Sequence, residues 1–303
     1  MTLRENLGVI AAGALALAAL PWLASDFVLS LALSCLMYIG LAVSWAMFSG
    51  STNYLSLATS AFFGIGAYVT AWGLDTLSYA LVVPLGGLAA AAFAALVGAG
   101  ILHLRGAYFA VLTFGLGELV LHAITYSEKT YAHTVGRVLQ EVPDSGTVFL
   151  TVLAIAAAAV AACAAVRKSR LGLALAGIGA DEERAQTLGV NTRLAKIAGF
   201  ALAAFFAGAL GAAVAVRWTY IEPASVFNPF IGFQTVLIAM IGGAQTLVGP
   251  MMSAVVFSLL TELLRLQFPY VYLIVLGALL IVLVLYLPGG LASLVSRWGR
   301  VGA

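Results

Sequence analysis

Ten stretches of mostly apolar residues run along this chain, each long enough or nearly long enough to cross a membrane. A membrane-crossing helix needs about 20 apolar residues, because each adds about 1.5 Å across a hydrocarbon core about 30 Å thick. The pattern predicts segments at 7–24, 27–48, 54–74, 79–102, 106–126, 147–166, 195–216, 230–243, 247–265 and 270–287. The eighth is short and the third contains Gly64 and Gly66, so these two are expected to be broken or re-entrant. The sequence thus predicts an all-α polytopic membrane protein of about ten helices.

The composition excludes most other classes of protein. Of the 303 residues, 63% are hydrophobic and only 9% are charged, too few charges to cover a soluble domain of this size. A net charge of +2 gives no indication of a nucleic-acid partner. Cys35 and Cys163 lie in apolar runs, and His103 and His133 have no metal ligands at helical spacing. We therefore expect neither a metal site nor a cofactor.

The charges predict which way the segments run. With the N-terminus in the cytoplasm, alternation places ten cationic residues inside: Arg4, Arg105, Arg167, Lys168, Arg170, Arg184, Arg193, Lys196, Arg297 and Arg300. Four fall outside: Lys129, Arg137, Arg217 and Arg265. This asymmetry predicts both termini inside, and the interrupted third and eighth segments, five apart, suggest two inverted halves. Although Arg4 and the apolar run after it resemble a secretory signal, the run continues to Ala24, so we expect a retained first helix.

The longest predicted cytoplasmic segment is 167–194, within what we interpret as one membrane domain covering 1–303. No loop is long enough to fold alone, so the protein acts within the membrane or recruits a partner. Acidic residues from Asp181 begin a predicted short helix, Ala185 and Leu188 are expected to share one face of it, and Gly189 ends it. This helix is either a solvated connector or a docking surface for a cytoplasmic motor.

Several motifs, in the same order along nearly the whole chain, carry a family resemblance. They are Ser56-Leu57 with Ala61–Tyr68; Arg105–Ala110 with Thr113 and Glu118; Glu182, Ala185, Leu188 and Gly189 followed by Lys196 and Ala201; Gly242-Gly243 with Thr246–Pro250; Glu262–Leu264; and Leu287-Pro288 with Gly290-Leu291. The chain resembles the Liv-type permeases of branched-chain amino acid ABC importers, the M-like subunit more than the H-like one. It departs from their pattern at Ala58-Thr59, at Gly179 in place of a loop arginine, and in the loop Thr130–Gly136.

The resemblance implies a function as well as a fold. It implies a permease subunit in the bacterial inner membrane, not an enzyme, with cytoplasmic ATP-binding subunits, a second permease subunit that is identical or homologous, and an external solute-binding protein as partners. The implied ATPase-coupling residues are Glu182, Ala185, Leu188 and Gly189. Candidates for the translocation path are Ser56, Thr59, Ser60, Gly64, Gly66, Thr113 and Glu118. Branched-chain or other hydrophobic amino acids are the expected solutes, followed by urea, aromatic acids and nucleosides.

An ionisable pair lies within the fifth segment. Glu118 is near its middle and His122 follows one turn later, and an ionisable residue at membrane depth is expected to face the bundle or a cavity and to have a partner. The pair is either a polar contact between helices or a proton relay or solute contact, and a relay would fit a proton-coupled secondary transporter. The three lysines follow no phosphate-binding glycine loop, so any ATP hydrolysis belongs to other subunits.

Overall fold

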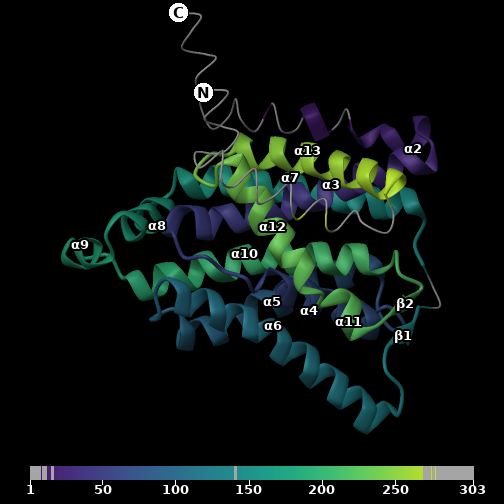
Figure 1. Cartoon of the computed structure of the whole chain (residues 1–303), viewed down its shortest axis with the longest axis horizontal. Helices are drawn as coiled ribbons and strands as arrows, with labels where there is room; N and C mark the ends of the chain where they lie inside the picture. The colour runs from purple at the N-terminus through teal and green to yellow at the C-terminus, as the bar shows by residue number, and fades with distance from the viewer. Residues whose placement is uncertain are drawn as a thin grey trace, which may run out of the picture.

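The computed structural model describes residues 17–139 and 142–268, together with residues 8, 12–14, 274 and 277, and they form an all-helical bundle with one small ribbon (Figure 1). The helices are α2 (Leu20–Leu23), α3 (Asp26–Trp45), η1 (Ala46–Gly50, a π-helix), α4 (Thr59–Gly73), α5 (Tyr79–Ile101), α6 (Ala107–Ser127), η2 (Glu128–Ala132, also π), α7 (Ser145–Arg167), α8 (Arg170–Ala180), α9 (Glu182–Thr187), α10 (Thr192–Ala215), α11 (Pro223–Val226), α12 (Pro229–Gly242) and α13 (Val248–Gln267). Strands β1 (Arg137–Val138) and β2 (Tyr220–Ile221) pair antiparallel.

The predicted class is confirmed, but ten spans are not. Within the described residues, seven helical stretches are long and apolar enough to cross a membrane: 26–50, 79–101, 107–131, 145–167, 192–215, 223–242 and 248–267. The expected segment 270–287 lies outside the described residues except for two of them, and 7–24 is described only in part. The count of ten and the inverted relation between two halves therefore stay predictions.

The third expected segment, 54–74, is helical over only 15 residues, Thr59–Gly73. The chain leaves η1 through Asn53, whose φ of 58° is left-handed, and residues 53–57 have no regular secondary structure. Trp45 Nε1 donates to Ser56 O at 2.8 Å, and Leu57 N donates to Thr113 Oγ1 at 3.0 Å. Side chains of α3 and α6 thus satisfy irregular backbone that lipid could not. The segment is interrupted, but the break precedes α4 and the helix runs unbroken through Gly64 and Gly66, so the expected break at these glycines is wrong.

The bundle has two distinct ends, which Figure 1 shows at left and right. The α9 end carries α8 and α9, and the ribbon end carries β1 and β2. The α5–α6 loop, the end of α7, helices α8 and α9 and the start of α10 carry the cationic residues of the α9 end: Arg105, Arg167, Lys168, Arg170, Arg184, Arg193 and Lys196. The ribbon end has Lys129 in η2, Arg137 in β1, Arg217 after α10 and Arg265 near the end of α13. The structure keeps together the described residues that the charge rule assigned to one side, whereas Arg4, Arg297 and Arg300 lie outside the described residues, and the orientation itself remains a prediction.

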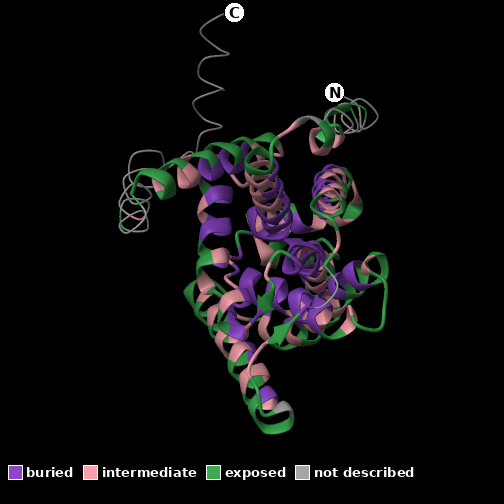
Figure 2. Ribbon diagram, turned by 90° about the vertical axis from the view of Figure 1, so that its right-hand side faces the viewer, coloured by how far each residue is buried: buried purple, intermediate pink, exposed green. Residues whose placement is uncertain are grey.

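The core of the bundle is α10, which has 67% of its apolar window buried, the largest share among the seven candidate spans of the described chain. Figure 2 shows buried residues concentrated at the centre of the bundle. Helices approach closely there because glycines meet: a Cβ added to Gly66 of α4 would lie 1.8 Å from Gly208 O of α10. A Cβ on Gly64 would lie 2.3 Å from the Phe227 ring. Gly64 and Gly66 thus occupy close packing contacts, which no larger residue could make, and their place on the path stays a prediction.

Candidate functional site

The predicted surface helix is present and its boundaries follow from its capping residues. Asp181 caps α9 by accepting hydrogen bonds from Glu183 N at 3.0 Å and Arg184 N at 3.1 Å. Gly189, with φ of 84°, ends the helical turn in the left-handed region that favours glycine. The sequence prediction of a helix from Glu182 stopped at Gly189 is therefore confirmed.

A second helix in the same segment was missed. Helix α8, Arg170–Ala180, precedes α9 within the expected loop 167–194. Ser169 caps it by accepting from Gly172 N at 3.3 Å, and its buried side includes Leu175 and Ile178. The serine cap followed by apolar residues three apart was the available signal. The segment is therefore a pair of helices rather than a loop with one helix.

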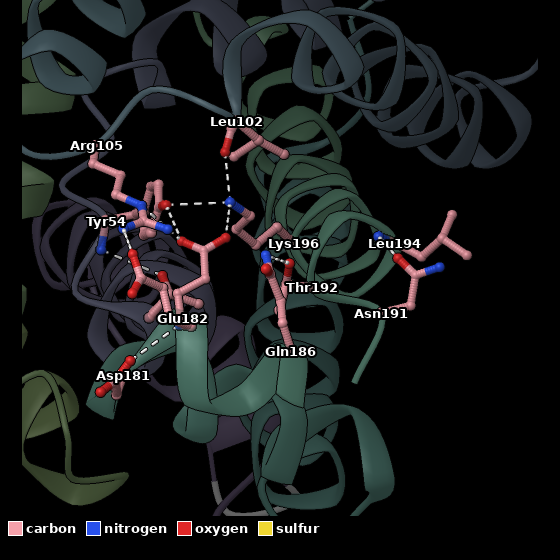
Figure 3. A network of polar contacts seen from close by, with 12 residues as sticks. Tyr54, Leu102, Arg105, Asp181, Glu182, Gln186, Asn191, Thr192, Leu194 and Lys196 are labelled. Atoms are coloured by element: carbon pink, nitrogen blue, oxygen red, sulfur yellow. Dashed lines mark hydrogen bonds and ion pairs between the residues drawn. The ribbon is translucent and has the colours of Figure 1, made fainter. Parts of the chain in front are cut away.

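A cluster of polar side chains joins α9 to the interior of the bundle (Figure 3). Lys196 Nζ of α10 donates to Glu182 Oε1 at 2.7 Å and to Leu102 O at 2.6 Å. Tyr54 Oη donates to Glu182 Oε2 at 2.7 Å, and Arg105 Nε lies 3.1 Å from that same oxygen. We call Tyr54, Arg105, Glu182 and Lys196 the tether cluster. It brings together the start of the 53–57 segment, the α5–α6 loop, α9 and α10.

The tether cluster is largely removed from water except at Arg105, whose side chain is 56% exposed. The side chains of Lys196 and Glu182 are 5% and 9% exposed. Burial opposes ionisation of Glu182, but the hydrogen bonds from Lys196 and Tyr54 and the charge of Arg105 outweigh it, so the pKa of Glu182 is lowered from its usual 4.5. A buried charge with three partners holds a fixed position, and it keeps α9 in place through them.

The structure divides the four expected coupling residues between two environments. Glu182 points inward into the tether cluster, and Ala185 is only 4% exposed. Leu188 is 83% exposed, and a Cβ on Gly189 would meet nothing within 4 Å. The expectation that Ala185 faces a partner, on one face with Leu188, is therefore wrong: Ala185 packs inside the chain because Glu182 turns its side of α9 inward.

Gly179 marks a close contact between α8 and the end of η1. A Cβ at this position would lie 2.2 Å from Ser51 O, and Asn53 Nδ2 donates to Gly179 O at 2.9 Å. A longer side chain at 179, such as the arginine of the family pattern, would require α8 to move away. Asn53, Tyr54 and Arg105 were not among the expected site residues, because nothing local in the sequence connects them with α9.

The hydroxyl-bearing path candidates lie together in the interior. Ser56, Thr59, Ser60 and Thr113 are each at most 5% exposed. Ser56 and Thr59, with Ser44 and Ser49 of the α3–η1 helix among others, line a cavity of about 20 Å³. This volume is about that of one water and far below that of an amino acid. The structure thus has a closed interior at this level, lined by hydroxyl groups together with aromatic and alanine side chains.

Glu118 and His122 are not inside the bundle. Their side chains are 36% and 78% exposed, and His122 Nε2 lies 3.9 Å from Glu118 Oε2, too far for a hydrogen bond. Within the described residues, the expectation that Glu118 faces the interior or a cavity is wrong, because α6 presents this side away from the bundle. Among the described residues, no three metal-binding side chains gather at one place.

A buried carboxylate organises the ribbon end. Glu128 is 5% exposed and its Oε2 accepts from Tyr68 Oη at 3.2 Å and from Gly136 N at 2.8 Å. Arg137 of β1 lies 5.9 Å from the centre of the Trp72 ring. These contacts attach the loop after α6 to the end of α4. Nothing local in the sequence marks Glu128, because its contact with Tyr68 joins residues 60 positions apart.

These features define a multi-pass α-helical membrane protein whose charged surface helix is joined by a buried ion-pair cluster to the interior. Comparison with known proteins identifies the family to which this membrane protein belongs. The profile of the family described as "Branched-chain amino acid transport system / permease component" matches residues 27–284, and the chain belongs to this family. It is a permease component of a branched-chain amino acid ABC transport system and a multi-pass protein of the bacterial inner membrane.

Two curated relatives cover almost all of the chain. Both are described as "High-affinity branched-chain amino acid transport system permease protein LivM", from Escherichia coli (strain K12) and from Salmonella typhimurium (strain LT2). Each is 26% identical to this chain over 328 residues, which span 96% of the chain and 75% of the relative. No solved structure matches. The family resemblance drawn from the motifs is therefore confirmed.

Proposed function

We propose that this chain forms part of the translocation path of an ABC importer for branched-chain or other hydrophobic amino acids. Cytoplasmic ATPase subunits bind at the α9 end, and an external binding protein delivers solute at the ribbon end. A second permease subunit completes the path. The family membership supports the importer class, and the charge asymmetry between the ends supports this orientation.

One observation carries the proposal: α9 is exposed on one side and held by buried ionic contacts on the other. Leu188 is 83% exposed, while the side chain of Glu182, at the start of the same helix, is 9% exposed. A motor protein can move a membrane protein only through a surface rigidly joined to its interior. A helix of six residues would not be rigid alone, and the tether cluster supplies the attachment.

The contacts continue from the tether cluster toward the path candidates. Tyr54, which binds Glu182, lies near the start of the irregular segment 53–57. In that segment Ser56 lines the small interior cavity, and Leu57 N is bonded to Thr113 of α6. A displacement of α9 therefore moves backbone that lines the closed interior. In our proposal, Ser56, Thr59, Ser60 and Thr113 line the path when it opens.

The test is uptake in proteoliposomes that contain the chain, its ATPases, the second permease and the binding protein. We expect uptake of labelled leucine, isoleucine or valine to require ATP. Leu188→Arg should reduce both ATPase recovery and uptake, because it alters the exposed side of α9. The matched control is Leu194→Arg, since Leu194 is 63% exposed at the same end but belongs to α10.

Each contrary result has a distinct meaning. Wild-type uptake and ATPase recovery with Leu188→Arg would remove α9 as the docking surface. Uptake driven by a proton gradient without ATP would favour a secondary transporter that uses Glu118 and His122. ATP-dependent uptake of urea, an aromatic acid or a nucleoside, with no amino acid transported, would keep the importer and change its solute.

A further inference from the structure

Helix α6 is poorly packed within its own chain. Only 22% of its apolar window is buried, against 33% to 67% for the other candidate spans of the described residues. Figures 1 and 2 both show α6 at the bottom of the molecule, where it diverges from the bundle and where exposed and intermediate residues predominate. A groove of about 830 Å³ runs between α5 and α6, lined by apolar residues between Val97 and Leu104 and between Ala107 and Leu119. Within the described residues nothing covers this side of α6, so it has space for a further helix.

The outward side of α6 has the residue spacing of a helix–helix contact. Val111, Gly115, Glu118 and His122 follow one another at intervals of four, three and four residues, so they form one line along the helix; we call them the α6 line. Val111 is 70% exposed, and a Cβ on Gly115 would meet nothing within 4 Å. A small residue in this position lets another helix approach closely. The geometry suits a helix better than a disordered acyl chain.

The chemistry of the α6 line also favours protein over lipid. Glu118 and His122 lie near the middle of a candidate membrane span, and at 3.9 Å they do not hydrogen-bond each other. Hydrocarbon offers these groups no partner, so an outward ionisable pair at this depth is expensive. A neighbouring helix with a polar side chain at the same depth would satisfy them.

We propose that the α6 line is the contact of this chain with a membrane-spanning helix of the second permease subunit, which hydrogen-bonds to Glu118 or His122. The inference rests on the proposed function, which requires two permease subunits. It assigns Glu118 to the boundary between subunits. The exposed face of α6 is thereby the surface that the importer covers on assembly.

Photo-crosslinking in membranes that contain the assembled importer tests this contact. A benzoylphenylalanine residue at Val111 or His122 should form an adduct with the second permease, whether that is another copy or a homologue. The same probe at Leu88, which is 57% exposed on α5, is the control and should form none. Adducts with lipid alone at Val111 and His122 would overturn the proposal.

Substituting two glycines in turn distinguishes a blocked subunit contact from general damage to the fold. Gly115 and Gly100 both have no atom within 4 Å of an added Cβ, so leucine fits at either position in the chain by itself. Gly115→Leu should lower the adduct yield at Val111 by about tenfold, because it blocks close approach, and Gly100→Leu should not. Unchanged yield with Gly115→Leu would overturn the proposed contact. ATP dependence of uptake, measured in the same membranes without substitution, tests the proposed function separately.

Discussion

Replacing Lys196 with methionine should detach α9 from the bundle without unfolding the bundle. The substitution keeps an apolar stem of similar length in α10 and removes the ammonium that binds Glu182 at 2.7 Å and Leu102 O at 2.6 Å. Removing one partner of a buried ion pair costs about 3–5 kcal/mol when the remaining charge has no other partner. Glu182 keeps Tyr54 and Arg105, so we expect about 2 kcal/mol, close to the value of one charged hydrogen bond.

That free energy corresponds to about a 30-fold change in the opening equilibrium of α9. Hydrogen exchange followed by mass spectrometry measures this opening equilibrium, because α9 amides are protected by local hydrogen bonds such as Ala185 N to Asp181 O at 3.0 Å. Their exchange should accelerate about 30-fold in Lys196→Met, while that of α7 stays unchanged. Arg193→Met is the control: Arg193 is exposed on the same helical turn, and its hydrogen bond within the described residues is a weak one, to Ala99 O at 3.4 Å.

A double variant tests the electrostatic reasoning. Adding Glu182→Gln to Lys196→Met removes the carboxylate charge that lost its lysine partner, and the amide oxygen can still accept a hydrogen bond from Tyr54. The exchange rate of the α9 amides should therefore return part of the way to the wild-type value. Unchanged exchange of α9 in Lys196→Met would refute the reasoning that the tether cluster holds α9. Equal acceleration in α7 would refute the claim that the effect is local.

Three further predictions concern packing, pH and orientation. Gly66→Val should prevent stable folding, since even a Cβ would lie 1.8 Å from a carbonyl oxygen of α10. Gly100→Val, at a position with open space, is the control, and purification yield and thermal unfolding temperature compare the two variants. Because the folded-state pKa of Glu182 is lowered, α9 protection should be constant above pH 4.5 and fall below it, and Glu182→Gln should lose this dependence in hydrogen exchange. Cysteine placed at Ser169 should react only with a membrane-permeant reagent from outside the cell, whereas cysteine at Ser145 should react with an impermeant one; both reacting from one side would contradict the orientation.

The sequence by itself determined the class of protein and the positions of several helices. Segments expected at 79–102 and 147–166 match α5, Tyr79–Ile101, and α7, Ser145–Arg167, within two residues. These helices were predictable because membrane thickness sets the length of an apolar run. Helix α9 was predictable because its ends depend on neighbouring residues, the Asp181 cap and the Gly189 stop.

Which side of each helix faces inward was decided only by the tertiary structure. In a soluble protein, polar residues mark the outer face, but here α6 and the core helix α10 are both apolar, so their patterns do not distinguish lipid, partner and core. Glu182 is buried because Lys196, 14 positions away, and Tyr54, 128 positions away, surround it in the fold. Glu118 is partly exposed because the described segments that pack against α6 leave this side of the helix uncovered. A sequence pattern shows which groups need partners, and only the arrangement of distant segments shows which of them find one.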